Sequence, residues 1–187
     1  MVVKDKKTKK RRWYNILATK NFGNTVIGET VSVDSANLIG RVVNYNLGML
    51  TRDIKLQNVK VGFRVNKVED NNALTEIVKY ELINSYIKRV VRAGRGKLDE
   101  SFVVETKDKV KLRLKIIVLT RNTVQRSVLT QMRKKLRDSF SDLLSKEDYE
   151  SFLANLISHR IQMNLKRELN KVYPVAVCEV RMMVKLK

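Results

Sequence analysis

The chain has 187 residues, in which 39 Lys and Arg face 19 Asp and Glu, so the formal net charge is +20 at pH 7. A hydrophobic content of 43% excludes a wholly disordered polybasic chain, and the longest apolar run, four residues, is too short to span a membrane. One cysteine, Cys178, and one histidine, His159, exclude an internal disulfide and a multi-cysteine zinc site. We therefore expect a soluble intracellular protein without a cofactor, a metal or enzymatic activity.

The positive charge predicts a polyanionic partner. A compact globule at +20 repels itself unless a polyanion neutralises it, and nucleic acid adds the gain from counterion release. An anionic membrane is the competing partner, which would favour one amphipathic helix with a basic face. The basic residues here also occupy expected strands and a tail, which favours RNA or DNA. A merely soluble basic protein is the third alternative.

Residues 1–12 read MVVKDKKTKKRR, and seven of them are Lys or Arg. No apolar period exists in this segment, so we predict a disordered basic arm that becomes ordered against phosphates. A localisation signal or solubility tail is the alternative. The candidate contacts on the arm are Lys6, Lys7, Lys9, Lys10, Arg11 and Arg12. Trp13 and Tyr14 follow directly, and either stack on bases or anchor the arm onto the folded domain.

The next segments predict a long loop over residues 22–40 and then strands. Alternation of apolar and polar residues indicates one strand from Val43 to Leu47 and another from Val59 to Val65. Ile54 and Leu56 have the opposite parity, which a bulge near Gln57-Asn58 would reconcile.

After a turn at residues 70–72, apolar residues from Leu74 onward follow helical spacing, which predicts a helix to about Arg92. Gly94 and Gly96 would end it. The end of this helix and the following loop carry a second basic cluster, which contains Arg89, Arg92, Arg95 and Lys97.

A hairpin is predicted next, with strands at Phe102–Thr106 and Val110–Leu119 around a turn at residues 107–109. One face of the second strand is apolar and the other carries Lys and Arg at alternate positions. These cations either contact nucleic acid or protect the strand from edge-to-edge aggregation.

A polar basic loop over residues 120–127 leads into a helix with five apolar residues facing inward, namely Leu129, Met132, Leu136, Phe140 and Leu143. The loop and the outer face of the helix form a third basic cluster, which contains Arg121, Arg126, Arg133, Lys134 and Arg137.

Ser145, with Asp148 three residues later, resembles a capping box at the start of another helix. A further helical stretch, which could continue that helix, begins at His159 and ends before Pro174. A closing strand follows, with Val180, Met182, Val184 and Leu186 on one face.

Two acid pairs are the remaining candidates for catalysis. Asp99-Glu100 is expected in a loop beside Lys97, and Glu147-Asp148 in the first turn of a helix, where acids favour the helix dipole. Neither pair is typical of a two-carboxylate or metal-dependent site. His159 is expected at a helix surface or start, and Cys178 as a small buried hydrophobic residue.

The order of several short blocks resembles a known family, the archaeal and eukaryotic small-subunit ribosomal proteins of the S-three-Ae type, also called eukaryotic-type S-one. Each block is weak alone, but together they span residues 11–187. The hairpin turn has Asp108-Lys109 where the family has Asp-Gly. The matching blocks are Trp13-Tyr14-Asn15-Ile16 with Ala18 and Phe22, Ile27-Gly28-Glu29-Thr30, Gly40-Arg41-Val42 with Leu47 and Leu50, a helix start at Leu74-Thr75, Gln131–Leu136, Val172-Tyr173-Pro174 and Val180–Lys185.

The resemblance implies a structural protein of the small ribosomal subunit, located in the cytoplasm within the ribosome. Its implied place is the platform near the mRNA exit side, and its implied partners are small-subunit rRNA, neighbouring small-subunit ribosomal proteins and, near the exit, mRNA. Eukaryotic members have an extension after the closing strand, so this sequence is more similar to the shorter archaeal form.

From residues and resemblance together, we predict an α+β fold: an antiparallel curved sheet or partly closed barrel with packed helices. Residues 1–12 would form the disordered basic arm and residues 13–187 a single rRNA-binding domain. The functional alternatives are a free RNA-binding factor or RNA chaperone that visits ribosomes transiently, and an RNA-processing enzyme.

Overall fold

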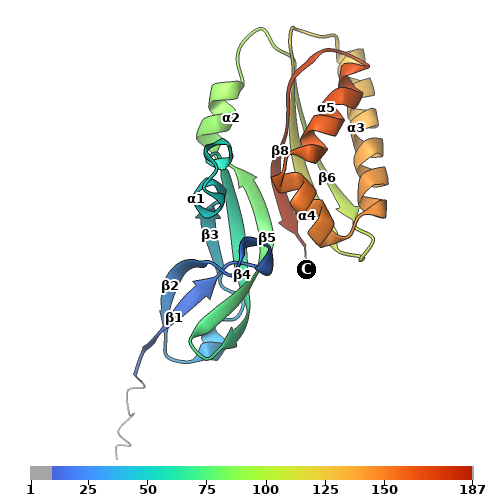
Figure 1. Cartoon of the computed structure of the whole chain (residues 1–187). Helices are drawn as coiled ribbons and strands as arrows, with labels where there is room; N and C mark the ends of the chain where they lie inside the picture. The colour runs from blue at the N-terminus through green and yellow to red at the C-terminus, as the bar shows by residue number, and fades with distance from the viewer. Residues whose placement is uncertain (1–9, 187) are drawn as a thin grey trace, which may run out of the picture. The chain divides into compact units, whose positions relative to one another are not determined.

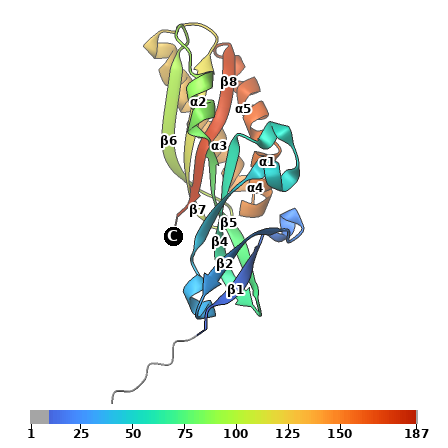
Figure 2. The ribbon, with the colours of Figure 1, turned by 90° about the vertical axis from the view of Figure 1, so that its left-hand side faces the viewer.

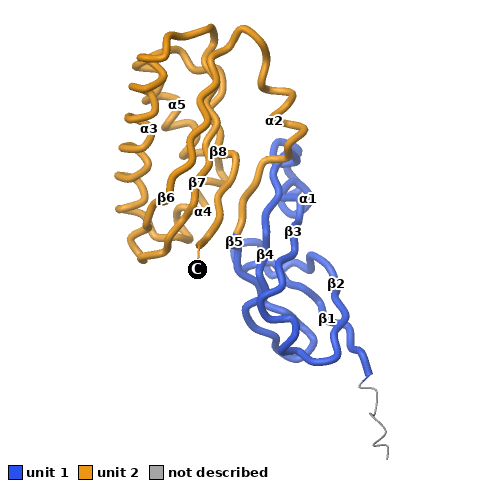
Figure 3. Tube along the Cα trace, turned by 180° about the vertical axis from the view of Figure 1, so that it is seen from behind, with its two compact units in different colours: residues 1–78 blue, residues 79–187 orange. Residues whose placement is uncertain are grey.

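The structure is a computed structural model that describes residues 10–186 (Figure 1). Lys6, Lys7 and Lys9 of the predicted arm lie outside the described residues. The predicted α+β class is confirmed: within residues 10–186 the strands form an eight-stranded sheet that does not close into a barrel. The chain divides into two compact units, of which unit 1 ends at Val78 and unit 2 begins at Lys79 (Figure 3).

Unit 1 is built mainly of strands. Most neighbouring strands are antiparallel, as predicted, whereas β1 and β5 are parallel, with Asn15 opposite Asn72. Its elements are β1 (Arg12–Leu17), a 3-10 turn η1 (Lys20–Phe22), β2 (Val26–Ser32), η2 (Ser35–Leu38), β3 (Val42–Asn46), α1 (Leu47–Thr51), η3 (Ile54–Leu56), β4 (Val59–Glu69) and most of β5 (Asn72–Leu82).

Two short helical turns replace predicted extended chain in unit 1. Leu47 was expected in a strand, but it begins α1, which the Asn46 side chain caps by accepting a hydrogen bond from the Gly48 N–H at 2.9 Å. A Cβ at Gly48 would lie 2.8 Å from Gln57 Cα, so only glycine permits this approach. The predicted bulge is wrong, because Ile54–Leu56 is a 3-10 turn.

The predicted helix from Leu74 to Arg92 is also wrong over most of its length. Residues up to Leu82 form β5, and only Asn84–Val90 form a helix, α2. β5 pairs with β1 and β4, and the Thr75 hydroxyl donates to the Leu17 carbonyl at 2.7 Å. These long-range partners, together with β-branched residues that suit strands, outweigh the helical spacing.

Unit 2 contains the last residues of β5 and all later elements. β5 pairs with β8 over Lys79–Glu81, and β8 then pairs with β7 and β7 with β6, all antiparallel. The elements are α2, β6 (Lys97–Glu105), β7 (Lys111–Thr120), α3 (Arg126–Lys146), α4 (Tyr149–Ile157), α5 (Arg160–Asn170) and β8 (Val175–Lys185).

The core of unit 2 lies between its sheet and α3, α4 and α5, which cover one face of β6–β8 (Figures 1 and 2). The predicted hairpin is confirmed as β6–β7, and the predicted inward residues Met132, Leu136 and Phe140 of α3 are fully buried. Leu144, not Leu143, continues that face. The Phe140 ring meets Phe102 of β6 edge-on at 5.7 Å.

Three details of the C-terminal half differ from the predictions. Ser145 belongs to the end of α3 and its hydroxyl donates to the Ser141 carbonyl, so no capping box forms. His159 has a positive φ of 58°, which separates α4 from α5. β8 bulges at Arg181, since Lys115 pairs with Met182 while Ile116 pairs with Val180. Met183 is therefore buried in place of its neighbours.

Candidate nucleic-acid interface

The N-terminal cluster is exposed where the structure describes it. Lys10, Arg11 and Arg12 are exposed, and Arg12 begins β1 opposite Ser32. Lys10 and Arg12 border a hollow of about 470 Å³, which Asp34 also borders. Arg12, which was predicted as the last residue of the disordered arm, therefore belongs to strand β1.

The adjacent aromatic residues differ sharply in exposure. Trp13 is 65% exposed, whereas Tyr14 is 5% exposed and packs with Leu38, Val65 and Ala73. Alternation along β1 produces this difference, because successive side chains point to opposite faces. The packing of Tyr14 supports the anchoring alternative for that residue, and Trp13 is placed where a base could stack.

The second cluster follows β5 in unit 2. Arg89 on α2 lies 5.6 Å from the centre of the Tyr86 ring, a cation–π distance, and Arg92 is exposed. Arg95 is half-buried. Lys97 is exposed at the start of β6, and its ammonium contacts the Asp99 carboxylate at 2.5 Å. Asp99 and Glu100 thus lie on a strand, not in the predicted loop.

The loop of the second cluster is joined to the loop of the third. The Gly96 N–H donates to Thr120 Oγ1 at 2.9 Å, and the Thr120 N–H donates to the Gly96 carbonyl at 3.0 Å. A Cβ at Gly96 would lie 2.7 Å from Thr120 Oγ1, so the contact requires glycine. We call residues 94–97 and 120–122 the basic loop pair, because these bonds hold Arg95 and Lys97 close to Arg121.

The third cluster continues along α3. Arg126, Arg133, Lys134 and Arg137 are all exposed, which confirms the predicted outer face of this helix. Arg133, Lys134 and Arg137 border a hollow of about 450 Å³. We call these three residues the α3 cluster. Such a row of exposed cations on a rigid helix can bind consecutive phosphates.

Glu100 positions this cluster, and sequence analysis did not identify that role. Arg137 Nη2 donates to both carboxylate oxygens of Glu100, at 3.1 and 3.0 Å, and Arg133 Nε lies 3.5 Å from Oε1. The Glu100 side chain is only 10% exposed. One Arg137 nitrogen thus bridges both oxygens of a nearly buried carboxylate, and such charge-assisted hydrogen bonds are the stronger kind. Glu100 therefore holds two arginines in place at the cost of part of their charge.

Comparison with known proteins decides the family. The model of the ribosomal S3Ae family matches residues 2–187 of this chain. The chain belongs to the ribosomal S3Ae family. The resemblance inferred from the sequence blocks is therefore confirmed, although one of those blocks, the helix start at Leu74-Thr75, lies in strand β5.

Archaeal members of the S3Ae family are similar along almost the whole chain. The small ribosomal subunit protein eS1 of Sulfurisphaera tokodaii is 33% identical over 178 residues, which cover 95% of this chain and 92% of the relative. The eS1 proteins of Desulfurococcus amylolyticus and Nanoarchaeum equitans are each 31% identical, over 179 and 173 residues. They cover 96% and 92% of this chain, and 84% and 87% of the respective relative.

As a member of this family the protein is a structural, non-enzymatic component of the ribosome. Cys178 is buried, and burial raises the pKa of its thiol to about 12, so the unreactive protonated form predominates. Among residues 10–186, no cluster of His, Cys, Asp or Glu could hold a metal ion. No helix in the same range is long and apolar enough to span a membrane.

Proposed function

We propose that this protein binds small-subunit rRNA on the platform of the subunit, near the mRNA exit side, through phosphate contacts and without chemical turnover. Its general role as a structural constituent of the ribosome, in the cytoplasm, follows from its family. The observation that carries the finer proposal is the exposure of its basic clusters on a chain with a net charge of +20.

The mechanism is electrostatic. Lys and Arg side chains replace condensed counterions along the phosphate backbone, and the released ions supply much of the free energy of binding. A-form RNA presents its backbone and shallow groove, so contacts to phosphates and shape dominate. The α3 cluster and the basic loop pair lie on hydrogen-bonded elements of one unit, which lets them hold an RNA helix in a fixed orientation.

Further features of the proposal concern domains and partners. We infer that residues 13–187 act as one rRNA-binding domain, since β5 contributes residues to both compact units. Neighbouring ribosomal proteins are the expected protein partners, and mRNA near the exit is a further partner. Exposed apolar side chains such as Met49 and Ile54, which are 71% and 80% exposed, are candidates for protein contacts.

Sedimentation in high salt tests the proposal against its alternative. Ribosomes from cells that express the tagged chain are centrifuged through sucrose gradients at increasing salt. We expect the protein to remain with the small subunit after transiently bound factors are released. Release together with those factors would instead support a free RNA-binding factor or RNA chaperone.

A further inference from the structure

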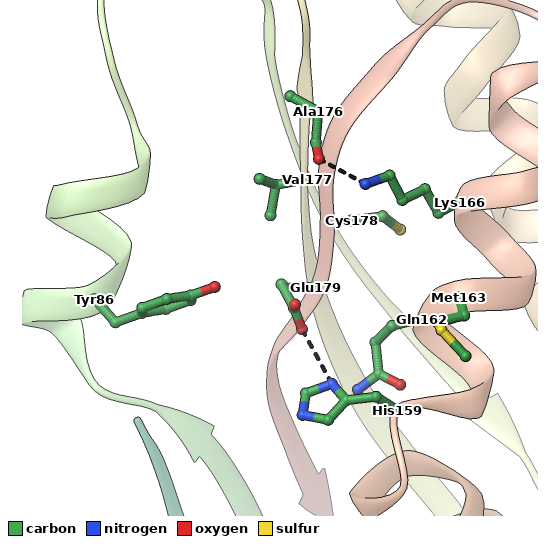
Figure 4. Close-up of a pocket in the computed structure, with 9 residues that line it drawn as sticks. All are labelled: Tyr86, His159, Gln162, Met163, Lys166, Ala176, Val177, Cys178 and Glu179. Atoms are coloured by element: carbon green, nitrogen blue, oxygen red, sulfur yellow. Dashed lines mark hydrogen bonds and ion pairs between the residues drawn. The ribbon is translucent and has the colours of Figure 1, made fainter. Parts of the chain in front are cut away.

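A hollow of about 280 Å³ lies beside β8 in unit 2 (Figure 4). β5 pairs with β8 only at Met182–Val184, so the earlier part of β8 has no strand on that side within residues 10–186. Tyr86 of α2 borders the hollow on one side of β8, and residues of α5 border it on the other (Figure 4). Pockets for drug-sized ligands are about 300–1,000 Å³, so this hollow suits a smaller group.

Three buried polar atoms beside the hollow have no hydrogen-bond partner in the described part of the chain. They are Glu179 Oε2, Gln162 Oε1 and the hydroxyl of the neighbouring Tyr80. His159 Nδ1 lies 3.7 Å from Glu179 Oε2, which makes an ion pair when the imidazole is protonated but is longer than a hydrogen bond. Gln162 is 3% exposed, and its amide nitrogen donates to the Leu156 carbonyl, which fixes its oxygen. Buried acceptors without donors are costly, and a bound ligand can satisfy them.

The surroundings of these acceptors are cationic and aromatic. Lys166 Nζ donates to the Ala176 carbonyl at 2.8 Å, which leaves two further protons on its ammonium group. The Tyr86 ring forms one wall, and the Arg89 guanidinium lies against that ring. The hollow therefore combines acceptors inside with an aromatic wall and positive charge at its edge.

We propose that this hollow binds one unpaired guanine base of RNA. The inference rests on the proposed RNA-binding function and adds to it a site that reads a base. Guanine carries two neighbouring donors, N1–H and the N2 amino group, which match the two oxygens of an ionised carboxylate. Its O6 atom, next to N1, can accept a hydrogen bond from the Lys166 ammonium group, and its ring can stack against Tyr86. Unpaired bases are commonly read in this way, by stacking and by contacts to their Watson–Crick edge.

The other bases present a poorer match to Glu179. Adenine and cytosine each place a ring acceptor beside their amino group, and that acceptor would face a carboxylate oxygen. Uracil has a single N3–H between two carbonyl acceptors. An ionised carboxylate can make two hydrogen bonds only with guanine, so the contact discriminates among bases.

Two protein ligands fit the surroundings less well. A Lys or Arg side chain from a neighbouring protein could satisfy Glu179, but it would be repelled by Lys166 and Arg89. An added peptide strand would need the free backbone edge of β8, and Lys166 already occupies the Ala176 carbonyl there. A cation placed at a strand edge disfavours strand addition.

The electrostatics of Glu179 agree with a site that takes a hydrogen-bond donor. Burial raises the pKa of its carboxyl from 4.5 to about 7, and the positive charge of Lys166 only partly opposes this. Two donors from guanine would stabilise the ionised form and lower that pKa. Guanine binding should therefore weaken as the pH falls below 7 and the carboxyl becomes protonated. The other ionisable groups near Glu179 are Tyr80, Tyr86, His159, Lys166 and Cys178.

Fluorescence anisotropy with short RNAs tests the site. The full chain is titrated with U-rich heptamers that carry G, A, C, U or inosine at the central position. We expect the G heptamer to bind about tenfold more tightly than the A, C and U heptamers at pH 8. Inosine lacks the N2 amino group and should fall between. In Glu179→Gln the preference for G should shrink to less than about twofold, while affinity for the all-U heptamer stays unchanged.

Matched variants make the result decisive. Glu150→Gln removes the same charge from an exposed position on α4 and should retain the preference for G. Tyr86→Leu removes the stacking ring and should weaken binding of every heptamer whose central base enters the hollow.

Equal binding of all heptamers, or a preference that survives Glu179→Gln, would overturn the guanine site while leaving general RNA affinity intact. Loss of affinity for every RNA in the unmodified protein would contradict the proposed function itself. An Arg-rich peptide that binds through Glu179, with no preference for G, would assign the hollow to a protein neighbour.

Discussion

Two carboxylates of unit 2 have similar burial and opposite surroundings. The side chains of Glu100 and Glu179 are 10% and 19% exposed. Arg137 donates to both oxygens of Glu100, and Arg133 lies close to one of them. Glu179 has an oxygen with no donor within hydrogen-bond distance in the described residues, and its pKa is raised to about 7. Partners, more than burial, thus determine whether a carboxylate stabilises this fold or creates a demand for a ligand.

The largest expected effect concerns stability at Glu179. Its pKa is about 7 in the folded chain and 4.5 ordinarily, so the folded state binds more protons between these values. The contribution of Glu179 to the free energy of unfolding is therefore fully present below about pH 4.5 and is lost as the pH rises to about 7. We expect Glu179→Gln to increase the free energy of unfolding at pH 8 by about 2 kcal/mol and to change it little at pH 4.5. Urea denaturation of both proteins across this pH range measures the difference. An identical pH dependence in wild type and variant would show that Glu179 titrates normally.

The next effect concerns RNA affinity. Replacing all three residues of the α3 cluster with Gln should weaken binding to small-subunit rRNA fragments about 30-fold at moderate salt and lower the salt slope by about three. The matched control replaces Lys55, Lys60 and Lys67, three exposed cations of unit 1, with Gln and removes the same total charge. Filter binding at several salt concentrations compares the two variants. Equal losses would mean that net charge alone, and not the position of the α3 cluster, determines affinity.

Glu100→Gln sharpens the contrast because its effect should have the opposite sign from Glu179→Gln. Removing the charge leaves Arg133 and Arg137 without their shared partner, and we expect the free energy of unfolding at pH 8 to fall by about 1 kcal/mol. The estimate is modest because both arginines are about half exposed. The same denaturation experiment detects it. A stabilising effect of Glu100→Gln would remove the distinction between the two carboxylates.

Trp13 and Tyr14 extend the contrast to unit 1, with the smallest expected effect on stability. Trp13→Ala should change the free energy of unfolding by less than about 0.5 kcal/mol, because the side chain is exposed. If Trp13 stacks on a base, the same variant should lose about 1 kcal/mol of RNA affinity. Anisotropy and thermal unfolding measure the two quantities. An unchanged affinity would leave Trp13 without a role in stacking.

The sequence predicted features that depend on local spacing. The inner and outer faces of α3 follow from helical periodicity, and the β6–β7 hairpin follows from alternation around a short turn. The basic clusters were visible for the same reason, since exposed Lys and Arg need no partner to be recognised. β5 was mistaken for a helix because its apolar spacing fits both periods, and the choice is made by β1 and β4, which are remote in sequence.

Features that depend on remote partners could not be predicted. Glu100 gave no local sign of its role, because its arginine partners lie on a different element and meet it only after α3 packs on β6. Glu179 precedes the predicted closing strand, and the sequence analysis did not identify it as a candidate. Its burial arises from Tyr86 and from residues of α5 that surround it, and these partners are remote in sequence, so no periodicity indicates them.

Crosslinking in intact small subunits, with mapping of both the attached peptides and the attached nucleotides, tests whether the basic clusters bind rRNA. We expect rRNA to be crosslinked to α3 around Arg133–Arg137 and to the basic loop pair, and we expect these crosslinks to decrease in the α3-cluster variant. Subunits in which these segments are crosslinked only to proteins, or to no partner at all, would contradict the claim that the exposed cations of unit 2 bind rRNA.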